Sequence, residues 1–180
     1  RGYLRAMREA GIVYSAFGTN RHWWSRFQLN FRNHRKIVVV DGREAFVGGL
    51  NVGDEYLGRS ARFGAWRDTH LAIRGPAVQA VQLVFLEDWF WATGDVPEVS
   101  DAIRPESRNQ ELQILPTGPA DPQDSWQLFV IESANLARER LWITSPYFVP
   151  DSGTLSALQA AALRGVDVRI LLPEKADHLL

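Results

Sequence analysis

The stretch RNHRKIVVVDGREAFVGGLN, residues 32–51, contains the clearest structural signal in the chain. Residues 37–40 are an unbroken aliphatic run, which predicts a strand covered on both faces. Asp41-Gly42 follows as a hairpin turn signal and leads into a second apolar stretch, residues 45–50. We therefore expect two neighbouring strands joined by a tight turn at Asp41-Gly42.

Working outward, the pattern alternates between strands and helices. Residues 3–11 have helical spacing and lead into a strand-like segment at 12–17, and residues 68–75 read as a further strand. Pro76 and Gly94 bracket an apolar helix, predicted to be well buried, with one stripe through Val78, Val81, Phe85 and Trp89.

A polar, proline-containing segment, residues 96–109, predicts a linker between two units. After it, strand and helix signals alternate, beginning with ELQILP at 111–116, and this order predicts a parallel sheet with helices on its faces. The fold class expected is therefore α/β.

Composition sets limits on function. The chain has 180 residues and no cysteine, which excludes disulfides and thiolate chemistry. The net charge of −1 conceals a basic segment: residues 1–43 contain nine Arg or Lys and two acidic residues, a balance of +7. Such a segment attracts phosphate-bearing partners, although a solvated basic surface is the commoner explanation.

Polar residues in the opening stretch recur at fixed spacing. His34 and Lys36 share one side of an extended chain, about 6.6 Å apart, whereas Asp41 has the opposite parity and sits at the turn. Imidazole can attack or protonate, and an ammonium can neutralise a phosphoryl oxygen. The spacing H-x-K-x4-D-x6-G-G-x-N is met by His34, Lys36, Asp41, Gly48, Gly49 and Asn51.

This spacing is similar to the motif of the phospholipase D superfamily. Further stretches resemble bacterial cardiolipin synthases along nearly the whole chain, namely GGLNVGDEYLG, WRDTHLAIRGPAVQAVQLVFLEDW, SPYFVPD and RGVDVRILLPEKADH. The resemblance implies that a phosphatidyl group passes from one phosphatidylglycerol to another through a phosphohistidine, with release of glycerol.

The resemblance also implies roles for individual residues. The candidate catalytic residues are His34, Lys36, Asp41 and Asp68, with Asp68 holding the His34 ring and Asp41 bracing the turn. Asn51, Gly48 and Gly49 are candidate substrate-binding residues, since an amide can donate to a phosphate and glycines admit a close backbone approach. No metal or other cofactor is expected.

The resemblance implies a layered α-β-α fold with a mixed, mostly parallel sheet. Members of the superfamily carry two such motifs in a duplicated fold, and this chain carries one. We therefore expect residues 1–95 to be the C-terminal part of the first half. Residues 110–180 would be the N-terminal part of the second half, ending before its motif. The second motif would then come from a missing part of the same chain. The expected location is the bacterial cytoplasmic membrane, reached through segments absent here, with anionic phospholipids as partners and no nucleic acid.

Two alternatives remain open at this point. One is another phosphodiesterase of the superfamily, either a lipid hydrolase or a nuclease that builds its site from two chains. The other is a non-catalytic module that docks its basic segment on phosphate groups, although such docking does not require the whole His34, Lys36 and Asn51 set.

Overall fold

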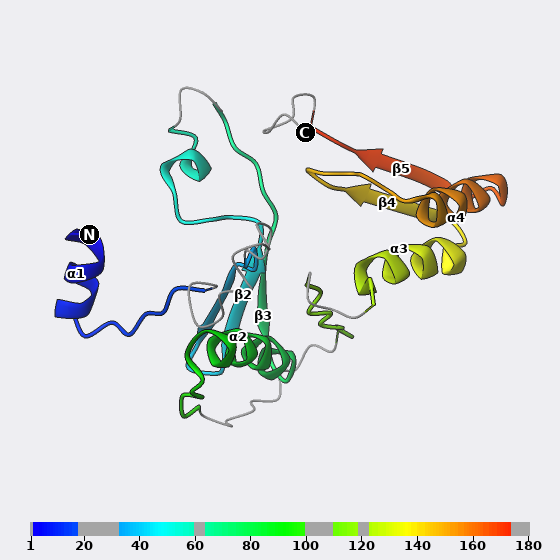
Figure 1. The fold of residues 1–180 in the computed structure, drawn as a ribbon. Helices are drawn as coiled ribbons and strands as arrows, with labels where there is room; N and C mark the ends of the chain where they lie inside the picture. Colours follow the sequence, from blue (N-terminus) through cyan, green and yellow to red (C-terminus); the bar gives the residue numbers. More distant parts are fainter. Residues whose placement is uncertain (1, 18–32, 60–63, 100–109, 119–122, 174–180) are drawn as a thin grey trace, which may run out of the picture. The chain divides into compact units, whose positions relative to one another are not determined.

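The computed structural model describes residues 2–17, 33–59, 64–99, 110–118 and 123–173 (Figure 1). The chain divides into two compact units, residues 1–116 and 117–180. The predicted linker at 96–109 ends before this division, and its residues 100–109 lie outside the described part. The first unit consists of α1 (Gly2–Glu9), β1 (Ile37–Val40), β2 (Glu44–Gly48), η2 (Asp54–Leu57), β3 (His70–Arg74) and α2 (Ala77–Thr93).

The strands of the first unit form one sheet in the order β1-β2-β3, with both pairings antiparallel. The predicted turn joins β1 to β2. Asp41 and Gly42 both have left-handed backbone angles, φ 53° and φ 65°, and the Arg43 amide donates to the Val40 carbonyl at 2.9 Å. Aspartate and glycine tolerate this conformation better than other residues, so their order in the sequence selects the hairpin.

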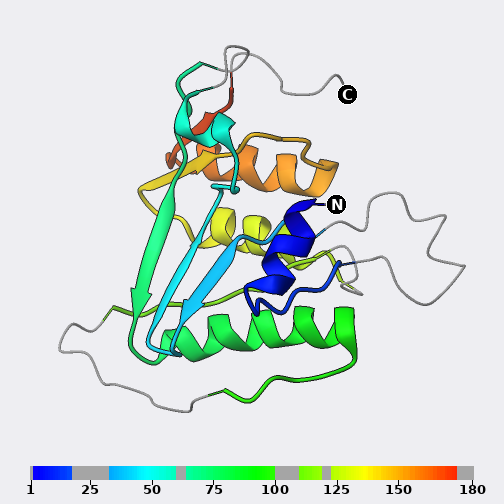
Figure 2. The ribbon, with the colours of Figure 1, turned by 90° about the vertical axis from the view of Figure 1, so that its left-hand side faces the viewer.

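The core of the first unit lies between the sheet and α2, which crosses all three strands and is seen at their lower ends in Figure 2. It consists of Ala45, Ile73, Val78 and Val81, with Ile37 and Val39 packed against them. On the other face of β1, Val38 is 55% exposed and Val40 44% exposed. Within the described part of the first unit, no helix lies over the even-numbered side chains, so the predicted cover on both faces is not observed there.

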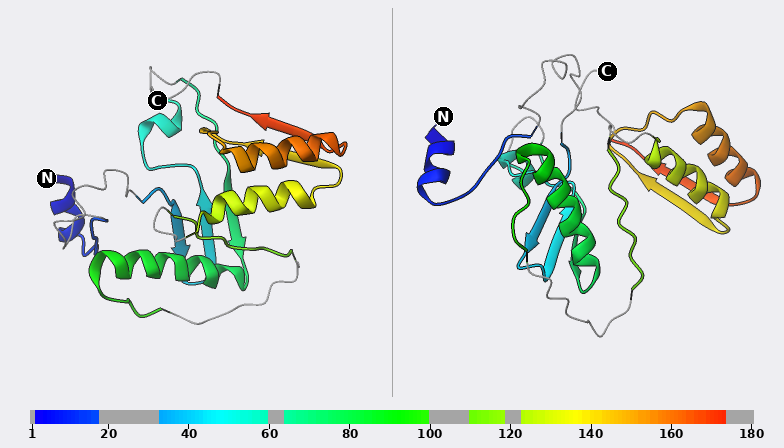
Figure 3. Two further views of the ribbon diagram at one scale, coloured as in Figure 1. Left: turned by 45° about the vertical axis from the view of Figure 1, so that its right-hand side comes forward. Right: turned by 60° about the horizontal axis from the view of Figure 1, so that its bottom comes forward.

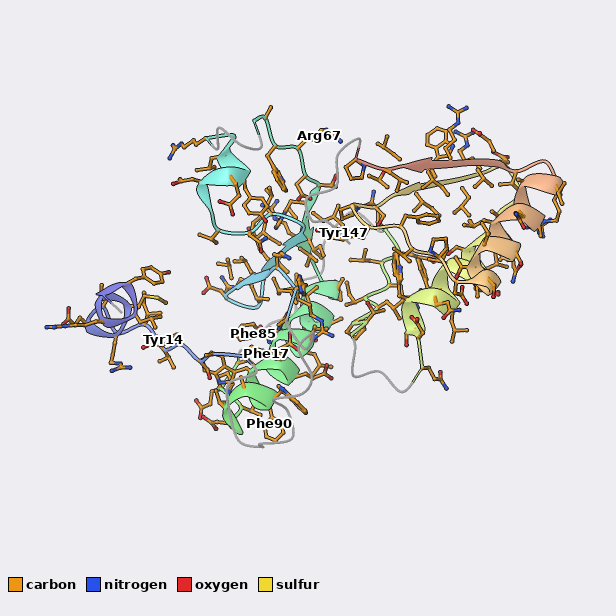
Figure 4. All side chains as sticks on the ribbon, turned by 45° about the horizontal axis from the view of Figure 1, so that its top comes forward. Tyr14, Phe17, Arg67, Phe85, Phe90 and Tyr147 are labelled. Atoms are coloured by element: carbon orange, nitrogen blue, oxygen red, sulfur yellow. The ribbon has the colours of Figure 1, made fainter. Side chains whose placement is uncertain are left out.

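Helix α2 was predicted from its bracketing residues. It spans Ala77–Thr93, and Gly94, at φ 77°, ends it by donating its amide to the Phe90 carbonyl at 2.7 Å. The helix is less buried than its apolar composition predicted. Its buried residues are Val78, Val81 and Val84. Phe85 is 41% exposed and Phe90 56% exposed, and both side chains are labelled on this helix in Figure 4.

The second unit consists of α3 (Ser125–Leu136), β4 (Arg140–Thr144), α4 (Ser152–Leu163) and β5 (Asp167–Leu171). Strands β4 and β5 pair in parallel, as the alternating pattern predicted. Helices α3 and α4 lie side by side (Figure 3) around a core of Ala134, Leu158, Ala161 and Val166. The Thr154 amide donates to Asp151 at 2.8 Å at the start of α4 and holds the pKa of that carboxyl below its usual range.

The α/β class is confirmed, with one antiparallel and one parallel sheet, but three details differ. Two of the three described strand pairings are antiparallel, so the mostly parallel sheet is not observed. The segments 12–17 and 111–116 form no strand. Residues 111–116 belong to the first unit, where Ile114 packs against the core. Among the described residues, no helix is long and apolar enough to cross a membrane.

Candidate active site

Strand register decides which motif residues lie near one another. Ile37 pairs with Val47, and Gly48 pairs with His70, so these residues form one end of the sheet, here called the motif end. Val40 pairs with Glu44, and Glu44 pairs with Arg74, which defines the opposite turn end. The motif end holds or directly adjoins six of the seven candidate residues, namely His34, Lys36, Gly48, Gly49, Asn51 and Asp68.

Asp41 is the exception, because it follows Val40 at the turn end. The four residues of β1 separate it from Lys36, so five residue steps span about 16 Å in an extended chain. Its left-handed φ of 53° places it in the hairpin turn. The structure thus brings His34 and Lys36 together and leaves Asp41 apart, in agreement with the expectation that Asp41 braces the turn.

His34 and Lys36 differ in exposure and in their contacts. His34 is exposed, whereas Lys36 is half-buried. The Lys36 ammonium donates to the carbonyl oxygen of His34 at 2.7 Å. The positive charge is therefore held beside the main chain of His34.

Gly48 and Gly49 each lie directly against an ionisable side chain. A Cβ on Gly48 would lie 2.3 Å from Nδ1 of His70, and a Cβ on Gly49 would lie 2.2 Å from Oδ1 of Asp68. Both distances are far shorter than any real contact of a Cβ atom. The two glycines therefore leave room for the Asp68 carboxylate and the His70 imidazole, a use of glycine that the sequence analysis did not predict.

Asp68 is fixed locally. Its Oδ1 accepts the Thr69 amide at 2.7 Å, and the Thr69 carbonyl accepts the Gly49 amide at 3.3 Å. No hydrogen bond joins Asp68 to His34 in the part of the chain that the structure describes. That Asp68 holds the His34 ring therefore stays a prediction, whereas the close approach of the Asp68 carboxylate to Gly49 is observed.

Asn51 is positioned by an aromatic neighbour. Its side-chain amide donates to the Tyr56 hydroxyl, and Tyr56, in η2, packs edge to face against Trp66 with ring centroids 4.9 Å apart. Sequence reasoning missed Tyr56, although a tyrosine five residues after Asn51 could have been recognised as a neighbour able to hydrogen-bond with its amide. The amide of Asn51 is thus presented from a short, aromatic-supported loop.

Sequence reasoning also missed Asp88 of α2. Its two carboxylate oxygens accept from the side chains on either side of His34: Arg35 at 2.5 Å and Asn33 at 2.8 Å. No local pattern could reveal a contact between residues 53 positions apart. The only signal was an acidic pair, Glu87 and Asp88, within a largely apolar helix.

The fold and the motif define a class of protein. A family model described as "Cardiolipin synthase, PLD-like domain" matches residues 130–180, most of the second unit. The arrangement is therefore that of a phospholipase D-like protein, with the His34 motif in the unit that precedes the matched region.

Relatives narrow the class further. The chain is 51% identical over 179 residues to "Cardiolipin synthase A" of Pseudomonas fluorescens (strain SBW25). It is 52% identical over 179 residues to the protein of the same name from Pseudomonas putida (strain W619). Each match covers 98% of this chain and 37% of the relative. The chain belongs to the bacterial cardiolipin synthase family and spans a little over a third of the length of these relatives.

Proposed function

We propose that this chain is part of a cardiolipin synthase that joins two phosphatidylglycerol molecules and releases glycerol. The observation that carries the proposal is the gathering of His34, Lys36 and Asn51 at one end of a single sheet. The relatives named cardiolipin synthase support this choice over other phosphodiesterases. The expected location of the whole protein is the bacterial cytoplasmic membrane.

The reaction proceeds in two balanced steps. In the first, an imidazole nitrogen attacks phosphorus, the bond from phosphorus to the glycerol oxygen breaks, and a second histidine protonates that oxygen. In the second, a hydroxyl of another phosphatidylglycerol loses its proton to the second histidine and attacks phosphorus, and the phosphorus–nitrogen bond breaks. His34 is one of the two histidines, and a second motif elsewhere in the same protein supplies the other.

Each remaining residue of the motif end has a role that its position supports. Lys36 and Asn51 donate to the phosphoryl oxygens, whose negative charge grows in each transition state. Asp68, seated on Gly49, accepts from one ring nitrogen of His34 once substrate is bound and so leaves the other nitrogen for the reaction. Asp41 shapes the hairpin and takes no part in the chemistry. No step requires a metal ion.

The test is His34→Ala in the full-length protein, with Arg43→Ala, an exposed cation at the turn end, as the matched control. Cardiolipin formation from labelled phosphatidylglycerol should fall at least about a thousandfold, as when a nucleophile or its acid partner is removed from other covalent enzymes. Flotation with phosphatidylglycerol vesicles should be unchanged in both variants.

Three other outcomes would contradict the proposal, each in a different way. Retained turnover by His34→Ala would remove this motif from the chemistry. Lost flotation without lost turnover would favour a docking module. Wild-type protein that releases phosphatidic acid and no cardiolipin would be a lipid hydrolase.

A further inference from the structure

The residues on either side of His34 are both bound to helix α2. Ile37 and Val39 of β1 pack against the core beneath the sheet, where α2 lies. Asn33 and Arg35 precede β1, lie outside the strand, and both reach α2 through Asp88. The segment that contains His34 is therefore fastened to the helix that covers this core.

Asp88 occupies a helix position that would suit an apolar residue. The buried residues of α2 are Val78, Val81 and Val84, and Asp88 comes four positions after the last of them, on the same stripe. Its side chain is only 17% exposed. A carboxylate loses hydration in such a place, so it needs hydrogen-bonded partners to be tolerated there.

Those partners all come from the motif segment. Arg35 donates to Oδ1 of Asp88 at 2.5 Å, and Asn33 donates to Oδ2 at 2.8 Å. The Arg35 amide also donates to Oδ1 of Asn33 at 2.8 Å, and a second guanidinium nitrogen donates to the Pro116 carbonyl at 3.3 Å. The residues on both sides of His34 are thus hydrogen-bonded through their side chains to one carboxylate, and they are also hydrogen-bonded to each other.

We propose that Asp88 is a positioning residue, which fixes the segment 33–36 through Arg35 and Asn33 so that His34 and Lys36 face the substrate in one register. The proposal rests on the proposed function for the chemistry that His34 performs. A positional error of about 1 Å at a reacting group can cost about a hundredfold in rate, so an anchor of this kind has a measurable effect.

The test compares Asp88→Asn with Glu44→Gln in the full-length protein. The control breaks the Glu44–Arg74 ion pair, which lies at the turn end of the same sheet and is far more exposed. For Asp88→Asn, kcat should fall between about tenfold and a hundredfold, with KM within about twofold. For Glu44→Gln, both constants should be unchanged.

A second measurement tests, independently of catalytic activity, whether Asp88 fixes the segment 33–36. Hydrogen–deuterium exchange of the peptide containing residues 33–36 should become at least about tenfold faster in Asp88→Asn, while peptides from β2 keep their rates. If Asp88→Asn does not accumulate as folded protein, Arg35→Lys tests the same anchor, because an ammonium keeps the charge but loses the forked donor geometry.

The outcomes separate the two proposals. Unchanged kcat in a folded Asp88→Asn protein, beside an inactive His34→Ala, would overturn the anchor and leave the proposed function standing. Unchanged exchange at 33–36, or an equal loss of kcat in Glu44→Gln, would also overturn it. An active His34→Ala would overturn the proposed function, and the exchange rates would then still decide whether Asp88 fixes this segment.

Discussion

The two ends of the β1-β2-β3 sheet are built from the same strands but held by different kinds of contact. At the turn end, the contacts either join residues that are close in the sequence or are exposed to solvent. The Arg43 amide donates to the Val40 carbonyl, and the side chains of the Arg74–Glu44 ion pair are 65% and 39% exposed. At the motif end, Arg35 and Asp88 are 53 residues apart, and their side chains are 30% and 17% exposed. The motif end therefore depends on the assembled tertiary structure, whereas the hairpin of the turn end forms from local sequence.

This difference explains why one sequence motif has two uses. His34 and Lys36 precede β1, and Asp41 follows it, so the strand divides the motif between the two ends. Residues at the motif end are expected to affect turnover, and residues at the turn end are expected to affect stability. Paired substitutions, one at each end, test this division.

The largest effect should come from the cation at the motif end. Lys36→Ala removes a donor aimed at the phosphoryl oxygens and should lower kcat by about a hundredfold to a thousandfold, the usual range for one transition-state donor. Arg43→Ala removes a cation at the turn end and should leave kcat within about twofold. Steady-state assays on both full-length variants would show this, and equal losses would mean that net positive charge matters more than position.

A second pair of variants compares glycines. Gly49→Ala puts a methyl group where the Asp68 carboxylate now lies, so kcat should fall by up to about a hundredfold as Asp68 moves. Gly42→Ala keeps the motif end intact but strains a residue at φ 65°, which should cost about 1 kcal/mol of stability. Thermal unfolding and kcat, measured on the same samples, separate the two effects. A fully active Gly49→Ala variant would show that the position of the Asp68 carboxylate beside Gly49 does not affect turnover.

A third pair compares two substitutions of one residue, Asp41, at the turn end. Asp41→Val forces a β-branched residue into a left-handed conformation and should cost about 1 to 2 kcal/mol, visible as a lower Tm. Asp41→Asn keeps a residue type that tolerates this conformation, so the folded protein should keep nearly full turnover. A large loss of kcat in a stable Asp41→Asn protein would show that the carboxylate acts at the motif end after all.

The smallest effect is expected at the exposed ion pair. Glu44→Gln should change the free energy of unfolding by no more than about 0.5 kcal/mol, because both side chains remain largely solvated. The small difference should vanish in concentrated salt. Chemical denaturation at low and high salt would test this, and a larger, salt-independent loss would show that the turn end is held as firmly as the motif end.

Local sequence was sufficient for part of the fold. Asp41-Gly42 predicted the hairpin, Pro76 and Gly94 predicted α2, and the alternating second unit predicted the parallel β4–β5 pair, all confirmed. The antiparallel pairing of β3 was not predicted, because a long connection follows β2 and sequence alone leaves strand direction open. Apolar segments at 12–17 and 111–116 failed as strands, because a strand requires a partner as well as an apolar composition.

The site was predicted from sequence as a set of residues but not as an arrangement. Spacing identified His34, Lys36 and Asn51, and register then explained why they gather at the motif end. Spacing could not show that Gly48 and Gly49 accommodate His70 and Asp68, since those contacts join neighbouring strands. It could not find Asp88 either, whose role depends on which stripe of α2 faces the sheet.

The face of β1 that no described element of the first unit covers has a practical consequence for anyone who prepares this chain on its own. Val38 and Val40 present branched apolar side chains to water along β1, which is also the edge of the described sheet. An exposed, β-branched edge strand is a template on which partly folded chains can add further strands. Refolding at high concentration should therefore compete with aggregation through β1, and Val38→Lys, on this face, should raise the soluble yield without disturbing the core.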